Sequence, residues 1–128
     1  MSSDFYSISQ QCRGYVVDRE VLYPDKFAAV GGSVTIQCHR SNSTPVLWQY
    51  KISAELNARD LYHGQRLVGD YANKCTINRS TYDLTIRQVT VADAGEYWCV
   101  EESGFGVKHV TKLFVTGSIL LLLHACET

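Results

Sequence analysis

Few residues of this chain could carry out acid-base chemistry, and no known catalytic motif joins them. His63 follows Asp60 by three positions among scattered serines, so a hydrolytic triad can be written from residue types alone. The sequence contains no G-x-S-x-G, H-E-x-x-H or phosphate-binding glycine motif to support one. Glu101 and Glu102 would point to opposite faces of a strand and cannot share a substrate. We expect no enzymatic activity, with His63 a solvated loop residue and both glutamates at a charged hairpin end.

Metal and cofactor chemistry is equally unsupported. Five cysteines, at positions 12, 38, 75, 99 and 126, form no C-x-x-C pair, and the four histidines, at 39, 63, 109 and 124, are scattered. Zinc sites need clustered ligands, so disulfides are the better interpretation. The triplets N-S-T at Asn42 and N-R-S at Asn78 are acceptor sequences for N-linked glycans, although such triplets often arise by chance and Pro45 follows the first. We expect no metal, no cofactor and an extracellular location, either secreted or in the ectodomain of a cell-surface protein.

Length and charge limit the chain to one ordinary domain. It has 128 residues, 45% hydrophobic and 20% charged, which suits a single globular domain with a real core. Twelve basic and thirteen acidic residues give a net charge of -1, so no basic stripe exists to bind nucleic acid. The N-terminus lacks a signal-peptide core, and we expect Met1 to begin a recombinant mature form. Ile119–Leu123 are five apolar residues against the roughly 20 that span a bilayer, so we expect no membrane insertion by this segment.

The elements that position these residues are expected to be short antiparallel strands. Period-two alternation marks residues 33–38, 82–86 and 110–115, and turn-forming residues separate such segments at 31–32, 41–45, 63–64, 78–81 and 103–106. Many short strands of this kind are typical of a sandwich or barrel. Residues 53–62 are the one stretch that could be helical, but their apolar positions hold no single face. We expect a loop there that leads into an edge strand.

A set of framework residues carries a family resemblance. Its members are Gly32, Cys38, Trp48 ten residues later, Leu84, and then the pattern D-x-G-x-Y-x-C at Asp93, Gly95, Tyr97 and Cys99. Together they resemble a variable-type (V-set) immunoglobulin domain, similar to antigen-receptor variable domains, over about residues 15–116. The resemblance implies an all-β fold, a two-sheet antiparallel immunoglobulin sandwich with additional C′ and C″ strands. We therefore expect an N-terminal extension at 1–14, the V-set domain at 15–116 and a C-terminal tail at 117–128.

The resemblance assigns a task to each framework residue. Cys38 and Cys99 would form the disulfide between the sheets, with Trp48 packed on it. Tyr97 fits the tyrosine corner, in which a hydroxyl bonds to backbone just upstream, and Gly95 gives that turn room. These residues are explained by the fold alone.

Further expectations follow from the family pattern. The Asp93 carboxylate would pair with a basic residue at the start of the fourth main strand, either Lys74, which we slightly favour, or Arg66. Strands C, C′ and C″ are expected at 46–51, 60–64 and 66–70. The last strand is similar to the joining segment of antigen receptors at Thr111, Leu113 and Val115, whereas Phe105 and Gly106 stand two residues too early for its F-G-x-G pattern. A joining-segment bulge and a plain strand after a glycine-rich hairpin both remain open.

Three cysteines are left after the framework pair. An additional Cys12–Cys75 disulfide would join the N-terminal extension to a strand near the sheet edge. Alternatively Cys75 is a buried thiol, or Cys12 or Cys126 links chains. Sequence alone does not fix the pairing.

The outward side chains of the G, F, C and C′ strands form the expected binding surface. Because Tyr97 and Cys99 point inward, Trp98 points outward, and tryptophan is the side chain most enriched among interface hot spots. The expected partner-binding residues are Trp98, Val100, Glu102, Gln49, Lys51, Val110, Lys112 and Phe114, with Lys108 at the rim. Alternatively, Trp98 is covered by loops or terminal segments, or simply lies exposed.

These observations predict recognition of a protein. The chain is interpreted as an immune-type receptor or cell-surface recognition domain that binds a protein ligand, or a second V-type domain, through this face. A homodimer is one form of this, although two symmetry-related copies of Lys51 would face each other unless an acid meets them. The alternatives are recognition of a microbial or small ligand by loop tips near 39–45, 54–59 and 103–106, and a structural spacer in an adhesion ectodomain.

Overall fold

The computed structural model describes residues 15–17, 19–52 and 55–117, which form strands and short 3-10 turns with no α-helix among them. The strands are β1 Tyr15–Val17, β2 Glu20–Leu22, β3 Lys26–Ala29, β4 Val34–Ile36, β5 Leu47–Lys51, β6 Arg59–His63, β7 Arg66–Leu67, β8 Cys75–Ile77, β9 Leu84–Ile86, β10 Gly95–Val100 and β11 Lys108–Thr116. The 3-10 turns are Gly69–Asn73, Val91–Asp93 and Glu102–Gly104.

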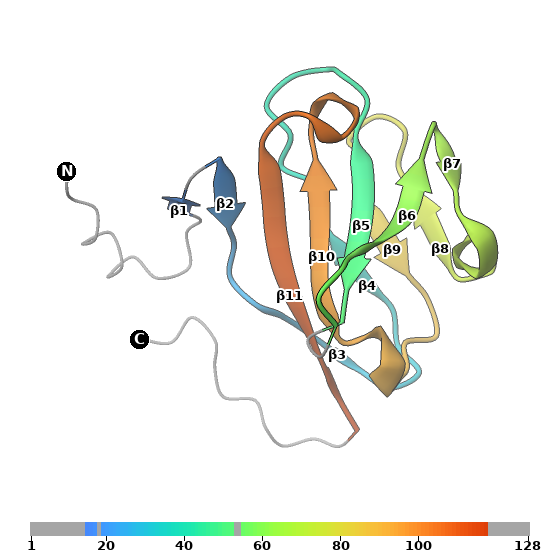
Figure 1. Ribbon diagram of the computed structural model, residues 1–128. Coiled ribbons are helices and arrows are strands. Elements are labelled where there is room, and N and C mark those ends of the chain that lie inside the picture. Colours follow the sequence, from blue (N-terminus) through green and yellow to red (C-terminus); the bar gives the residue numbers. More distant parts are fainter. Residues whose placement is uncertain (1–14, 18, 53–54, 118–128) are drawn as a thin grey trace.

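Two sheets pack face to face in a sandwich. The larger has the order β1-β2-β11-β10-β5-β6-β7, with β3 also paired to β11, and the smaller has the order β4-β9-β8. In Figure 1 the large sheet lies in front of the small one. In the strand nomenclature of immunoglobulin domains, β4 to β11 are strands B, C, C′, C″, D, E, F and G. The expected all-β sandwich is thus confirmed.

Alternation of side chains explains why these segments form strands. In β4, Val34 and Ile36 are buried while Thr35 is exposed, and β9 repeats this pattern with Thr85 opposite Thr35. The two threonine hydroxyls lie 2.8 Å apart on the outer side of the small sheet. Period two therefore puts one apolar row toward the core and a polar row outside.

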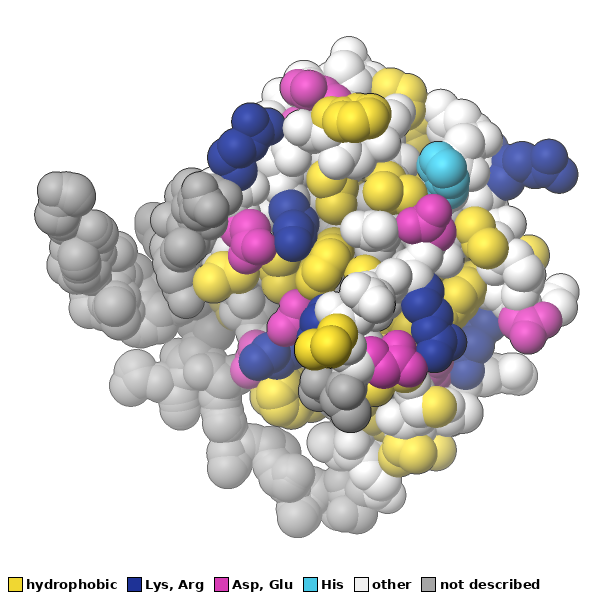
Figure 2. All heavy atoms as spheres, in the orientation of Figure 1, with side chains coloured by type: hydrophobic (Ala, Val, Ile, Leu, Met, Phe, Trp, Pro, Cys, Tyr) yellow, Lys and Arg dark blue, Asp and Glu magenta, His cyan; other side chains and the backbone are white. Residues whose placement is uncertain are grey.

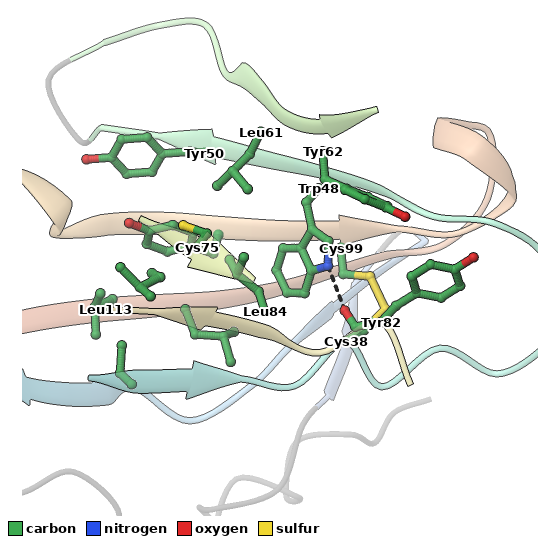
Figure 3. Packing of buried hydrophobic residues seen from close by; sticks show 14 of the residues in the cluster. Cys38, Trp48, Tyr50, Leu61, Tyr62, Cys75, Tyr82, Leu84, Cys99 and Leu113 are labelled. Atoms are coloured by element: carbon green, nitrogen blue, oxygen red, sulfur yellow. Dashed lines mark hydrogen bonds between the residues drawn. A yellow bond between two sulfur atoms is a disulfide. The ribbon is translucent and has the colours of Figure 1, made fainter. Parts of the chain in front are cut away.

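The core forms around Trp48 and the intersheet disulfide, as shown in Figure 3. Cys38 and Cys99 are joined with their Cα atoms 5.3 Å apart, which confirms the expected disulfide. The Trp48 indole is fully buried and donates its N–H to the Tyr82 carbonyl at 2.8 Å, so its polar atom is satisfied. Closing a loop of 61 residues contributes about 4 kcal/mol by chain-entropy reasoning.

The turn that enters β10 is fixed by several contacts. The Tyr97 hydroxyl donates to the Asp93 carbonyl at 2.5 Å, which is the tyrosine-corner contact. Gly95 has φ +152°, and a Cβ there would lie 2.6 Å from the Lys51 carbonyl oxygen. The Lys74 ammonium lies 2.8 Å from the Asp93 carboxylate, so Lys74 rather than Arg66 supplies the basic partner.

Some element boundaries differ from expectation. The expected C″ strand at 66–70 is only two residues long, because the chain turns into the 3-10 segment Gly69–Asn73. Strand E begins at Leu84 rather than residue 82, since Tyr82 has a positive φ of 64° and cannot continue the strand. Of the stretch 53–62, residues 55–58 are irregular and a strand begins at Arg59, while residues 53–54 lie outside the described part.

The last strand runs without a bulge along β10. Its register is unbroken from Gly95 opposite Leu113 to Val100 opposite Lys108. A plain strand after a hairpin therefore describes this segment, and the joining-segment bulge is absent from the β10–β11 pairing. On its other edge β11 pairs in parallel with both β2 and β3.

Cys75 is a buried free thiol, so the candidate Cys12–Cys75 disulfide is not formed and the alternative of a buried thiol is confirmed. The physical reason is the direction of its side chain, which belongs to the core cluster between the sheets rather than to the surface. Burial raises the pKa of Cys75 to about 11, which keeps the thiol protonated and unreactive at neutral pH. Cys12 and Cys126 lie outside the described residues.

Candidate functional site

The GFCC′ face, defined here as the outward side of β11, β10, β5 and β6, is built from rows of cross-strand neighbours. The register gives three rows, which are Lys51–Glu96–Lys112, Gln49–Trp98–Val110 and Leu47–Val100–Lys108. Residues directly opposite each other have Cβ atoms roughly 5 Å apart, so each row is a line of contacting side chains. Figure 2 shows hydrophobic, basic and acidic side chains interspersed over the large sheet.

Trp98 lies at the centre of the middle row and is already engaged within the domain. Its indole N–H donates to the Glu96 carboxylate at 2.9 Å. The Lys108 ammonium sits 3.7 Å from the ring centroid in a cation-π contact and 3.2 Å from the Glu20 carboxylate. The tryptophan is therefore half-buried, with one polar edge and one ring face satisfied by neighbours.

Some charged side chains of this face have ion-pair or hydrogen-bond partners within the domain, and others have none among the described residues. Glu96 sits between Lys51 and Lys112 in its row. An acid of the same chain therefore lies beside Lys51, the lysine whose two copies were expected to face each other in a symmetric homodimer. Within the described residues, neither Lys51 nor Lys112 forms an ion pair. Asp60, by contrast, accepts a hydrogen bond from Gln49 at 3.1 Å.

The expected apolar centre is smaller than its residue list suggested. Val100 and Val110 point outward, but both are buried and would form the base of an interface. Phe114 is exposed but lies four residues beyond Val110 on β11, about 13 Å at ~3.3 Å per residue. There its ring packs near Phe27, with centroids 5.4 Å apart. Trp98 is the large aromatic in the middle of the face.

Glu102 does not belong to the face, because β10 ends at Val100. The chain then turns, and Glu102 has a positive φ of 53° in the hairpin between β10 and β11. Extending the alternation of the strand two residues too far produced the error. Glu102 is exposed at the loop end of the domain.

Glu101, expected at a charged hairpin end, is instead buried in a polar network. Its carboxylate lies 2.5 Å from His109 Nε2 and accepts hydrogen bonds from the Ser41 N–H at 3.1 Å and hydroxyl at 3.0 Å. His109 Nδ1 in turn lies 2.9 Å from the Tyr23 hydroxyl. Glu101 is only 2% exposed and His109 5%. Sequence reasoning missed this network because Ser41, His109 and Tyr23 come from three distant segments.

Hydrogen bonding decides the ionisation of Glu101. Burial would raise the pKa of a carboxyl group, but the hydrogen bonds from His109 and Ser41 favour the charged form and lower the pKa of Glu101 below its usual value. The ionised carboxylate joins the loop after β4 to the last strand.

The network does not form a catalytic triad. Ser41 donates to Glu101 rather than to a histidine nitrogen, and both nitrogens of His109 already have partners. No base is therefore available to activate the serine hydroxyl. His63 and Asp60, the other pair considered, lie 3.5 Å apart with both side chains largely exposed. Among the described residues no group of histidines, cysteines and acids could hold a metal ion.

The loop end carries the most exposed aromatic side chain described. Phe105 is 85% exposed, and the hairpin that holds it is tied to the β4–β5 loop by hydrogen bonds from Ser103 N–H to the Pro45 carbonyl and from Glu102 N–H to the Thr44 hydroxyl. The two candidate glycan acceptors, Asn42 and Asn78, are exposed, the first in the loop between β4 and β5 and the second in the connection between β8 and β9.

Comparison with known proteins agrees with this architecture. The sequence model of the immunoglobulin V-set domain matches residues 24–116, so the chain belongs to the V-set family. A similar solved structure is an extracellular domain of the voltage-gated sodium channel beta4 subunit, whose parallel homodimers were described as explaining its role in cell-cell adhesion. That structure has 16% sequence identity and a TM-score of 0.57 and covers 86% of this chain and 96% of its own. No curated protein matched the sequence.

Family membership settles the class of activity. V-set domains are recognition domains without enzymatic activity. In the part of the chain that the structure describes, no helix has the length and apolar character to cross a membrane.

Proposed function

We propose that this chain is a cell-surface or secreted recognition domain that binds a protein through its GFCC′ face. The observation that carries the proposal is the central position of Trp98, with the buried valines Val100 and Val110 beneath the face and charged side chains around it. An apolar anchor with a polar rim is the usual anatomy of a protein interface. The partner is a protein ligand or a second V-type domain.

Strand pairing supports the boundaries that we propose for the binding domain. The family match begins at residue 24, but β2 pairs with β11 along Lys108–Val110 and β1 pairs with β2. These strands extend the sheet that carries the face. We therefore propose that the domain comprises residues 15–116.

Replacement of Trp98 tests the proposed function. Trp98→Glu removes the aromatic anchor and places a charge at the centre of the face, so we expect at least a tenfold loss of binding, equivalent to about 1.4 kcal/mol or more. Self-association is measured by sedimentation equilibrium, and ligand binding is measured by staining cells that display surface proteins with the multimerised domain.

The matched control is Phe105→Glu, which introduces the same charge at the exposed loop tip. If binding depends on Phe105 and not on Trp98, the loop-tip alternative replaces the GFCC′ face. If wild-type protein shows neither self-association nor cell binding, the proposal fails and a spacer role describes the domain better.

A further inference from the structure

The ring face of Trp98 holds a charged group of its own chain. The Lys108 ammonium lies 3.7 Å from the ring centroid and 3.2 Å from a carboxylate oxygen of Glu20. Lys108 reaches the ring diagonally across the strands, because Trp98 is opposite Val110 and Lys108 is two residues before that position. An aromatic face and a carboxylate thus converge on one cation.

We propose that Trp98 and Glu20 form a cation-binding site, in which Lys108 is a built-in occupant that a lysine or arginine side chain of the protein partner displaces. The inference rests on the proposed function of the GFCC′ face, because it names the chemistry of the group that docks at its centre. The ligand class is an alkylammonium or guanidinium group.

The chemistry of the site suits a cation. The face of an indole ring carries negative electrostatic potential and attracts ammonium and guanidinium groups. The Glu96 carboxylate accepts the Trp98 N–H at 2.9 Å, which adds electron density to the ring and strengthens that attraction. Glu20 then supplies a charge-assisted hydrogen bond.

Lys108 is held loosely enough to exchange. The side chains of Lys108 and Glu20 are 27% and 38% exposed, and ion pairs this accessible to water are weak. An incoming cation reproduces both contacts, while the released ammonium returns to water.

The experiment removes the built-in occupant and offers a substitute. In Lys108→Ala protein labelled with nitrogen-15, the Trp98 indole N–H signal is assigned by its loss in Trp98→Phe and followed by NMR. The probes are N-acetyl-lysine amide and N-acetyl-norleucine amide, which differ by the ammonium group. We expect a saturable shift with the lysine compound only. In wild type its apparent affinity should be at least ~2-fold weaker, because a tethered ammonium that occupies the site half of the time or more leaves at most half of the sites open to the free compound.

Two controls define the site. Lys26→Ala removes an exposed lysine of β3, outside the GFCC′ face, and leaves Lys108 over Trp98, so it should behave as wild type. Adding Glu20→Gln to Lys108→Ala should weaken the lysine compound at least ~3-fold, because a charged acceptor is replaced by a neutral one. If Lys108→Ala loses its fold by circular dichroism, Lys108→Met, which retains the aliphatic stem, takes its place.

The proposal is overturned if the opened variant shows no saturable shift, if the norleucine compound binds equally well, or if Lys26→Ala opens the site to the same degree. These results are distinguishable from failure of the proposed function. Partner binding that depends on Trp98 without a response to the lysine compound overturns the cation site alone. An intact response without any Trp98-dependent partner binding overturns the proposed function alone.

Discussion

At the scale of single residues, Glu101 is the clearest case of a side chain whose environment reverses expectation. A carboxylate in a hairpin would ordinarily be solvated, yet this one accepts hydrogen bonds from Ser41 and contacts His109 while almost fully buried. Removing one member of such a network leaves the others buried and unsatisfied, which costs more than the net value of the contact.

We predict that Glu101→Gln lowers the free energy of unfolding at pH 7 by ~2 kcal/mol. The lowered pKa of Glu101 in the folded state means that its stabilising effect is present above the pKa of the unfolded glutamate, about 4.3. That contribution is lost as the pH falls through the folded pKa. The gap between wild type and variant should therefore begin to narrow as the pH falls below about 5 and should keep narrowing as the pH passes through the folded pKa of Glu101, as measured by urea denaturation.

The control for this prediction is Glu102→Gln, a neighbouring exposed acid. Its effect should stay within about 0.5 kcal/mol at every pH, as for most surface substitutions. A gap for Glu101→Gln that is constant across this range would show that ionisation of Glu101 does not contribute to stability.

At the scale of elements, the entry to β10 depends on one glycine. Gly95 combines a positive φ with a backbone oxygen 2.6 Å from where a Cβ would stand. We predict that Gly95→Ala lowers the free energy of unfolding by ~3 kcal/mol, since the clash adds to backbone strain. The loss is measured first as a lower midpoint of thermal unfolding for Gly95→Ala than for the wild type.

Gly31→Ala is the matched control, because Gly31 also has positive φ, at +88°, but nothing within 4 Å of its Cβ position. It should cost only about 1 kcal/mol, the value of left-handed strain alone. Equal losses for the two variants would show that the close approach to Lys51 has no separate effect.

How far sequence predicts these elements depends on whether the signal is local. Tyr97, Gly95 and Cys99 sit in one short pattern, and each takes the place that the family resemblance assigned to it. The Trp98 ring contact with Lys108 could not be predicted, because it requires the register of β10 against β11 and a side chain that crosses it diagonally.

The burial of an outward-pointing side chain, Val110, could not be predicted from the sequence either. The alternation of side chains along β11 correctly predicts that Val110 points outward. How far that side chain is exposed depends instead on what lies beside the strand. Leu22 of β2 pairs opposite Val110 and extends the sheet beyond its expected edge. Alternation predicts direction, whereas exposure is decided by neighbours from distant segments.

At the scale of the whole molecule, neither candidate glycan acceptor lies on a strand of the binding face. Asn42 lies in the loop after β4 and Asn78 in the connection between β8 and β9 of the opposite sheet, and both are exposed. We predict that the chain, when secreted from animal cells, carries N-linked glycans at both positions.

Digestion with peptide N-glycosidase should then lower the mass in two steps, as seen by mass spectrometry. Asn42→Gln and Asn78→Gln should each remove one step, and neither should reduce binding through Trp98. An unchanged mass after digestion of the secreted protein would rule out glycosylation at both sites.

The parallel pairing of β3 with β11 also determines how the domain responds to mechanical force. The chain enters the domain through β1 and β2, continues through β3 and leaves through β11, so tension between its ends pulls both β2 and β3 past β11 in the opposite direction. The hydrogen bonds between β3 and β11, from Lys26 opposite Leu113 to Ala29 opposite Thr116, are then loaded in shear and must break together. The Cys38–Cys99 disulfide keeps the segment between those cysteines from extending even after the hydrogen bonds between these parallel strands have broken.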